Sequence, residues 1–121
     1  MNKKVPALSI FFPFWNEEKN IERVIKNAIP VVERMAEKWE IIAVDDGSSD
    51  NTLQIAKKIA ETHPNITVVS HTTNRGYGAA LRSGFEKAKH DLIVFTDGDG
   101  QFDFSQVNKF LKKIEKSDIV I

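Results

Sequence analysis

Three oxygen-bearing side chains alternate with glycines where an apolar run ends. Residues 92–95 are apolar, and Asp97, Asp99 and Gln101 follow at every second position. Alternate side chains of an extended segment share a face, so these three groups point the same way. Their oxygens suit a hard cation such as Mg²⁺ or Mn²⁺, and the glycines let a ligand approach the backbone closely. The pattern predicts a metal site for a phosphorylated ligand, with a polar turn as the alternative.

Other kinds of metal site are not supported by the sequence. A calcium loop is excluded, because Phe102 stands where it needs glycine and Asn108 where it needs a bidentate glutamate. His63, His71 and His90 show no metal-ligand spacing, and we expect all three at the surface.

The composition is that of a globular chain. Its 121 residues are 41% hydrophobic, enough for the core of one domain or of part of one. The 17 basic and 17 acidic side chains cancel, so no overall field attracts nucleic acid or an anionic membrane. The absence of cysteine excludes disulfides and thiolate catalysis and fits a reducing compartment.

The first residues imitate a secretory signal, because Lys3 and Lys4 precede the apolar residues 5–15. Pro13 interrupts that run, and no small-x-small cleavage site follows it. A buried first strand explains the segment better. No stretch of the sequence is interpreted as a transmembrane helix.

Apolar runs alternate with helical periodicity along the chain. The runs predict strands at residues 7–12, 39–44, 66–70 and 92–96, and a fifth from Asp118. The helical patterns begin near Ile21, after Asp50, after Gly76 and at Asp103. This alternation predicts an α/β fold, with a mostly parallel sheet, helices on both faces and right-handed connections.

Two of these helices carry further expectations. Pro30 is expected to kink the first helix or to open a second segment. The helix after Gly76 has the clearest single-face pattern, and Tyr77 and Phe85 belong to its inward face.

Polar or glycine-containing loops follow each of the first four predicted strands. They cover residues 13–17, 45–50, 71–78 and 97–101. The carboxyl ends of parallel strands meet at one edge of a sheet, where such folds bind ligands. The four loops therefore predict a single binding site along that edge.

Four segments, in order, carry a family resemblance: FFPFWNEEKNI, EIIAVDDGSSDNT, NRGYGAALRSGFEKA and DLIVFTDGDGQFD. Together they resemble the inverting family-2 glycosyltransferases of the GT-A fold, in the group that contains dolichol- and polyprenol-phosphate sugar synthases. The resemblance implies a Rossmann-like GT-A domain. Residues 1–121 would be its nucleotide-sugar-binding part, truncated after the fifth strand.

By this resemblance, loop residues bind the nucleotide-sugar. They are Pro13, Trp15, Glu17, Val44, Asp46, Arg75, Asp97 and Gly98. Trp15 offers a base a flat face, with a core position as the alternative, and Glu17 accepts hydrogen bonds from base or ribose. Asp46 is favoured over Asp45 for contact with base or ribose. The segment Ser48-Ser49-Asp50 is interpreted as turn and helix cap.

The loop Asn74-Arg75-Gly76 precedes a predicted helix. Its free N–H groups and the positive end of the helix dipole are expected to face a diphosphate, helped by Arg75. The loop is no dinucleotide fingerprint, because Leu81 stands where the third glycine of G-x-G-x-x-G belongs.

The resemblance also implies Mg²⁺ or Mn²⁺ on Asp99 and Gln101, with Asp97 holding the metal or the nucleotide. The metal would neutralise the departing nucleoside diphosphate while an acceptor attacks the anomeric carbon from the opposite face, which inverts the configuration. The implied donor is a GDP- or UDP-sugar. The implied acceptor is polyprenyl phosphate, which needs no strong base, whereas a sugar hydroxyl as the acceptor would need one. No catalytic residue is assigned within this chain.

Further expectations concern context. The family's acceptor half falls beyond Ile121, so we expect a fragment or a short gene product with doubtful activity alone. The strand from Asp118 would leave an open edge for self-association. The implied location is cytoplasmic, at the cytoplasmic face of a membrane if missing segments or a partner attach the chain there.

Two other functions stay open. One is a non-catalytic nucleotide-binding or interaction module. The other is a sugar-phosphate nucleotidyltransferase, although FFPFWNEE lacks the Gly-rich basic signature usual after the first strand of such enzymes.

Overall fold

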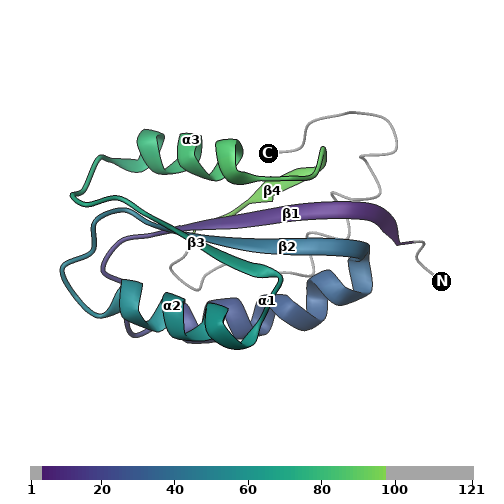
Figure 1. The fold of residues 1–121 in the computed structure, drawn as a ribbon, viewed down its shortest axis with the longest axis horizontal. Coiled ribbons are helices and arrows are strands. Elements are labelled where there is room, and N and C mark those ends of the chain that lie inside the picture. The colour runs from purple at the N-terminus through teal and green to yellow at the C-terminus, as the bar shows by residue number, and fades with distance from the viewer. Residues whose placement is uncertain (1–3, 98–121) are drawn as a thin grey trace.

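The computed structural model describes residues 4–97 as a parallel four-stranded sheet between two layers of helix (Figure 1). The elements are β1 (Val5–Phe14), α1 (Ile21–Met35), β2 (Ala36–Asp45), α2 (Thr52–Thr62), β3 (Ile66–Ser70), α3 (Tyr77–Lys87) and β4 (Ile93–Phe95). The strand order is β3-β2-β1-β4, and every neighbouring pair is parallel. The predicted α/β fold is confirmed. The helix expected at Asp103 and the strand from Asp118, with its expected self-association, lie outside the described residues.

Strand β1 lies between β2 and β4 and is buried on both faces. Phe12 and Phe14 pack in the core that α1 and α2 cover, whereas Phe11 packs under α3. Successive side chains of a strand point to opposite faces, so a continuous apolar run suits a strand covered on both sides. The buried first strand is therefore confirmed. Pro30 lies within α1, which continues to Met35 without a second segment.

Helix α3 approaches the sheet closely at Gly84. A Cβ built there would lie 2.3 Å from Cδ1 of Phe11, so only glycine fits above that ring. Phe11 also contacts Phe85 edge-on, with ring centroids 5.1 Å apart, and stacks on Phe95 at 5.4 Å. The prediction that Tyr77 and Phe85 lie on the inward face is wrong for Tyr77, which is 54% exposed, and incomplete for Phe85, which is 42% exposed.

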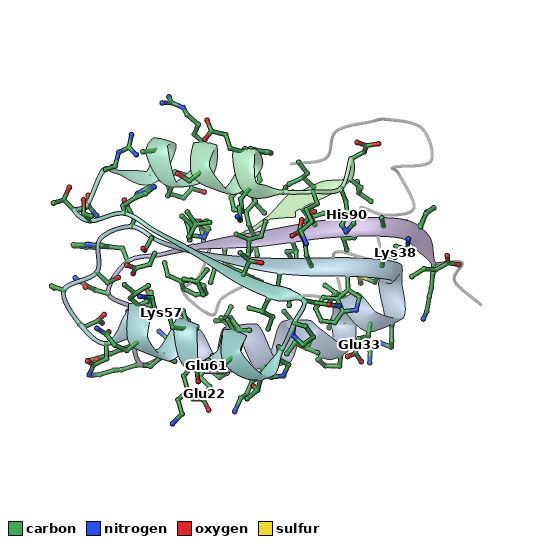
Figure 2. All side chains as sticks on the ribbon, viewed as in Figure 1. Glu22, Glu33, Lys38, Lys57, Glu61 and His90 are labelled. Carbon is green, nitrogen blue, oxygen red and sulfur yellow. The ribbon has the colours of Figure 1, made fainter. Side chains whose placement is uncertain are left out.

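The outer faces of α1 and α2 carry the charged side chains. Glu22 and Glu61 project from these helices away from the sheet (Figure 2), and Lys57 on α2 is also exposed. Across residues 4–97, no helix is both long and apolar enough to cross a membrane.

A buried carboxylate holds the segment that leads into β4. Glu40 Oε2 accepts hydrogen bonds from Ser9 Oγ and from the Lys89 N–H, both at 2.6 Å. The His90 N–H donates to Ser9 Oγ at 3.1 Å. His90 lies toward the end of the sheet opposite the loops that follow β1, β2 and β3 (Figure 2). These bonds fix where β4 joins β1, and so where the chain arrives at Asp97.

Candidate functional site

The loops after β1, β2 and β3 gather at one edge of the sheet (Figure 1). A cavity of about 480 Å³ opens there, within the range of small-molecule sites. It is lined by Pro13, Phe14, Trp15, Glu17, Asp46, Asn74, Gly76, Tyr77, Ala80 and Asp97. All four predicted loops contribute residues to this cavity, so the prediction that they meet at the carboxyl edge is confirmed. That the cavity binds a ligand stays a prediction.

The loop after β1 is tied to the loop after β2. Asn16 adopts φ 52°, a left-handed conformation that Asn tolerates better than most residues. Its N–H donates to Ser48 Oγ at 2.9 Å, and its Oδ1 accepts the Ser49 N–H at 2.8 Å. The adjacent Trp15 is 54% exposed at the cavity, which excludes the core alternative for this side chain.

Glu17 is anchored through its backbone and its side chain. Its N–H donates to Thr52 Oγ1 at 2.9 Å, and its Oε2 accepts a bond from Asn20 Nδ2 at 2.9 Å. Asp50 precedes the N-cap residue Asn51 of α2, and its Oδ1 accepts the Thr52 N–H at 2.9 Å. Ser48 and Ser49 instead bond across to Asn16, a connection between loops that the turn-and-cap interpretation missed.

Neighbouring residues at the end of β2 face opposite sides of the sheet. Asp46 lines the cavity, whereas Asp45 does not and is 2% exposed. Asp45 Oδ2 accepts the Ser48 N–H at 3.4 Å, and its Oδ1 is buried without a partner. Val44 is fully buried in the cluster under α3, and its side chain does not line the cavity. Its role in nucleotide binding stays a prediction.

The Asp46 carboxylate is already engaged within the protein. Oδ1 accepts bonds from His71 Nδ1 at 2.7 Å and from the Arg75 N–H at 2.9 Å, and Oδ2 accepts the Gly76 N–H at 3.0 Å. Burial alone would raise the pKa of Asp46, but the bonds from Arg75, His71 and Gly76 outweigh it and lower the pKa. The expectation of free N–H groups is therefore wrong for Arg75 and Gly76. The surface position expected for His71 is also wrong, because this residue is buried.

Tyr77 is a site residue that the sequence interpretation missed. It lines the cavity, and its hydroxyl donates to Asp97 Oδ1 at 3.1 Å. Burial, then the Asp97 charge and this hydrogen bond raise the pKa of Tyr77, so the phenol keeps its proton at neutral pH. The available signal was its position as the first residue of a helix beginning at the binding edge.

The charged groups of the lining are acidic. Glu17, Asp46 and Asp97 carry carboxylates, and no lysine or arginine lines the described part of the cavity. Arg75 is exposed and lies outside that lining.

A metal site is not formed by the described residues alone. Within residues 4–97, no three His, Asp or Glu side chains are grouped to hold a metal ion. Gly98, Asp99 and Gln101 fall beyond those residues, so their roles stay predictions. The exposed Asp97 carboxylate on an acidic cavity wall nevertheless fits one ligand of a divalent cation.

Solved structures with this arrangement are GT-A nucleotide-sugar transferases. One is a mannosyltransferase from Pyrobaculum calidifontis in complex with GDP-Man and Mn²⁺, with TM-score 0.79 and 28% identity over 93% of this chain and 33% of that one. Another is S. aureus TarS 1-349 in complex with UDP-GlcNAc, with TM-score 0.70 and 26% identity over 91% of this chain and 31% of that one.

Sequence comparison defines the family. A sequence model described as "Glycosyl transferase family 2" matches residues 9–121, and the chain belongs to this family. The dolichyl-phosphate beta-glucosyltransferase of Saccharomyces cerevisiae is 36% identical over 115 residues, which are 90% of this chain and 34% of that protein. The chain thus spans about a third of the length of this relative.

Proposed function

We propose that the chain forms the donor-binding part of a metal-dependent, inverting glycosyltransferase that uses a nucleoside-diphosphate sugar and polyprenyl phosphate. The chemistry of the cavity carries this proposal. Trp15 presents an aromatic face beside the carboxylates of Glu17 and Asp97, with no basic side chain in the described lining. A base stacks on such a face, whereas a diphosphate is repelled by the carboxylates unless a cation lies between them. A nucleoside diphosphate with a divalent cation meets both conditions.

The residues divide between the two ends of this ligand. Pro13 and Trp15 contact the base, and Glu17 accepts hydrogen bonds from the base or ribose. Asp46 Oδ2 accepts a single bond in the described residues, so a lone pair remains for a ribose hydroxyl. The exposed Arg75 side chain reaches for the phosphates.

Asp99 and Gln101 would hold Mg²⁺ or Mn²⁺, with Asp97 as a further ligand or as a contact to the nucleotide. When bound, the ion neutralises the charge that develops on the leaving nucleoside diphosphate. The P. calidifontis structure with GDP-Man and Mn²⁺ supports such a donor and ion. The UDP-GlcNAc complex of TarS supports a second class of donor base.

The transfer itself is a single displacement. A phosphate oxygen of the acceptor attacks the anomeric carbon opposite the leaving group. The bond from that carbon to the nucleoside diphosphate breaks, and its electron pair leaves with the diphosphate. An ionised phosphate needs no strong base, in keeping with the lack of an assigned catalytic base. The dolichyl phosphate in the name of the yeast relative supports an acceptor of this class.

Calorimetry with GDP and UDP, in Mn²⁺ or in EDTA, tests the donor site. We expect binding in Mn²⁺ and a large loss in EDTA. Asp99→Ala should remove the metal-dependent part of the affinity, whereas Asp91→Ala, at an exposed aspartate before β4, should not. Equal nucleotide binding in Mn²⁺ and in EDTA would show that the metal assignment is wrong. So would equal metal-dependent binding by the Asp99→Ala and Asp91→Ala variants.

Turnover is measured separately from binding. The 121-residue chain is incubated with radiolabelled GDP- or UDP-sugars, Mn²⁺ and polyprenyl phosphate. We expect nucleotide binding without useful transfer, because orienting a second substrate supplies on the order of 7 to 11 kcal/mol and no described residue is assigned to the acceptor. Robust formation of a glycosylated lipid would place the acceptor site within this chain or in a pair of copies.

A further inference from the structure

Residues 71–76, called here the β3–α3 loop, form hydrogen bonds to Asp46, the residue that follows β2. The Arg75 and Gly76 N–H groups donate to the two carboxylate oxygens of Asp46, at 2.9 and 3.0 Å. Asn74 Nδ2 donates to the main-chain oxygen of Asp46 at 3.2 Å. Asn74 and Gly76 also line the cavity, so the orientation of Asp46 determines the shape of that wall.

His71 is the side chain that orients Asp46. Its Nδ1 lies 2.7 Å from Asp46 Oδ1, and its Nε2 lies 2.7 Å from Ser83 Oγ on α3. An ionised carboxylate only accepts hydrogen bonds, so Nδ1 carries the proton that it donates. The His71 and Asp46 side chains are 5% and 6% exposed, so water does not replace this bond if it is lost. The imidazole is thus held at both nitrogens, by Asp46 after β2 and by Ser83 on α3.

The loop backbone also rests directly on Gly47. Gly47 has φ +70°, and a Cβ built there would lie 2.2 Å from the carbonyl carbon of Thr73 and 2.3 Å from the Asn74 nitrogen. The middle of the loop cannot move closer to β2. Its far end, at Arg75 and Gly76, is held by the Asp46 carboxylate.

We propose that His71 is a positioning residue for the donor site: by donating from Nδ1 to Asp46, it holds the carboxylate that sets the Arg75 and Gly76 backbone at the cavity wall. The consequence for nucleotide affinity rests on the proposed function. The geometry of the loop is testable without any ligand. Ser83 is the second anchor of the imidazole and does not line the described cavity.

Two substitutions that mimic parts of histidine test the contributions of its two ring nitrogens separately. In His71→Asn the side-chain amide N–H takes the place of Nδ1, whereas in His71→Gln it takes the place of Nε2. The readout is NMR hydrogen exchange of the Arg75 and Gly76 amides in the ligand-free chain. We expect exchange about ten-fold faster in His71→Gln and His71→Ala, and within about three-fold of wild type in His71→Asn.

A role in packing alone predicts the opposite order, because glutamine is closer to histidine in volume than asparagine is. Equal exchange in wild type and His71→Gln, or exchange in His71→Asn as fast as in His71→Gln, would overturn the proposal. His90→Asn and His90→Gln are matched controls toward the other end of the sheet and should leave both amides unchanged (Figure 2). The Asn and Gln variants decide the question even if His71→Ala does not fold.

Calorimetry with GDP or UDP and Mn²⁺ provides the second readout. If the wild type binds, we expect about ten-fold weaker binding in His71→Gln and less than about three-fold in His71→Asn. Unchanged affinity in His71→Gln would overturn the positioning role. If the wild type does not bind, the proposed function fails, and the amide exchange still decides whether His71 positions the loop.

Discussion

The hydroxyl of Tyr77 donates a 3.1 Å hydrogen bond to Oδ1 of Asp97, joining the first residue of α3 to the segment that leaves β4. The two residues are 20 positions apart and both line the cavity. Asp97 belongs to the stretch predicted to hold the metal. The hydrogen bond from Tyr77 therefore fixes the direction of one carboxylate oxygen of Asp97 before any ligand binds.

Tyr77→Phe removes this hydroxyl and keeps the ring. We expect Mn²⁺-dependent binding of GDP or UDP to weaken by about two- to ten-fold, because the Asp97 carboxylate is no longer oriented in advance. Calorimetry measures the change, and circular dichroism checks the fold. Equal or tighter binding would mean that the bond to Tyr77 competes with the ligand.

Trp15→Ala tests the aromatic face of the cavity. Stacking of a base on an aromatic ring is worth about 1 to 3 kcal/mol, so the dissociation constant for GDP or UDP should rise roughly ten-fold. Trp15→Phe keeps a flat ring and should lose less. Trp15→Leu, an apolar side chain without a ring, should lose nearly as much as alanine. A dissociation constant unchanged in the folded alanine variant would remove Trp15 from the binding site.

The lowered pKa of Asp46 predicts a dependence of stability on pH. The ordinary value of an aspartate is about 3.9, and the folded value lies below it. The contribution of Asp46 to the free energy of unfolding is therefore complete above about pH 3.9 and is lost as pH falls through the folded pKa.

Urea unfolding of wild type and Asp46→Asn between pH 2 and 7 measures this contribution. The difference between the unfolding free energies of the two proteins should be constant near neutral pH and should become smaller as the pH falls. Asp91→Asn, which removes an exposed carboxylate just before β4, is the control for the loss of one surface charge. A difference that does not change with pH would show that the Asp46 charge contributes nothing to folding.

Two glycines of α3 give a matched pair for stability. A Cβ at Gly84 would overlap the buried Phe11 ring, whereas a Cβ at Gly78 meets nothing within 4 Å. Gly84→Ala should therefore destabilise the chain by about 1 to 3 kcal/mol. Gly78→Ala should be neutral or stabilising by up to about 1 kcal/mol, because alanine favours helix. Equal stability of the two variants in urea would contradict this packing of α3 on β1.

Local pattern in the sequence was sufficient for the elements and for the edge that carries the site. The apolar runs at 7–12 and 39–44 lie within β1 and β2, since strands covered on both faces need continuous apolar sequence. Parallel strands bring their carboxyl ends together. The positions of Trp15, Glu17 and Asp97 at one cavity therefore followed from the order of the loops.

Tertiary structure alone decided the partners of the polar groups. His71 and Asp46 are 25 residues apart, and Asn16 and Ser48 are 32 apart, so their contacts depend on strand register and helix placement that no local pattern records. Single-face periodicity put Tyr77 inside, but this residue begins α3 at the cavity, where it is 54% exposed. Val44 lies within β2 and is fully buried. Asp46, two residues later, lies beyond the end of β2 and lines the cavity.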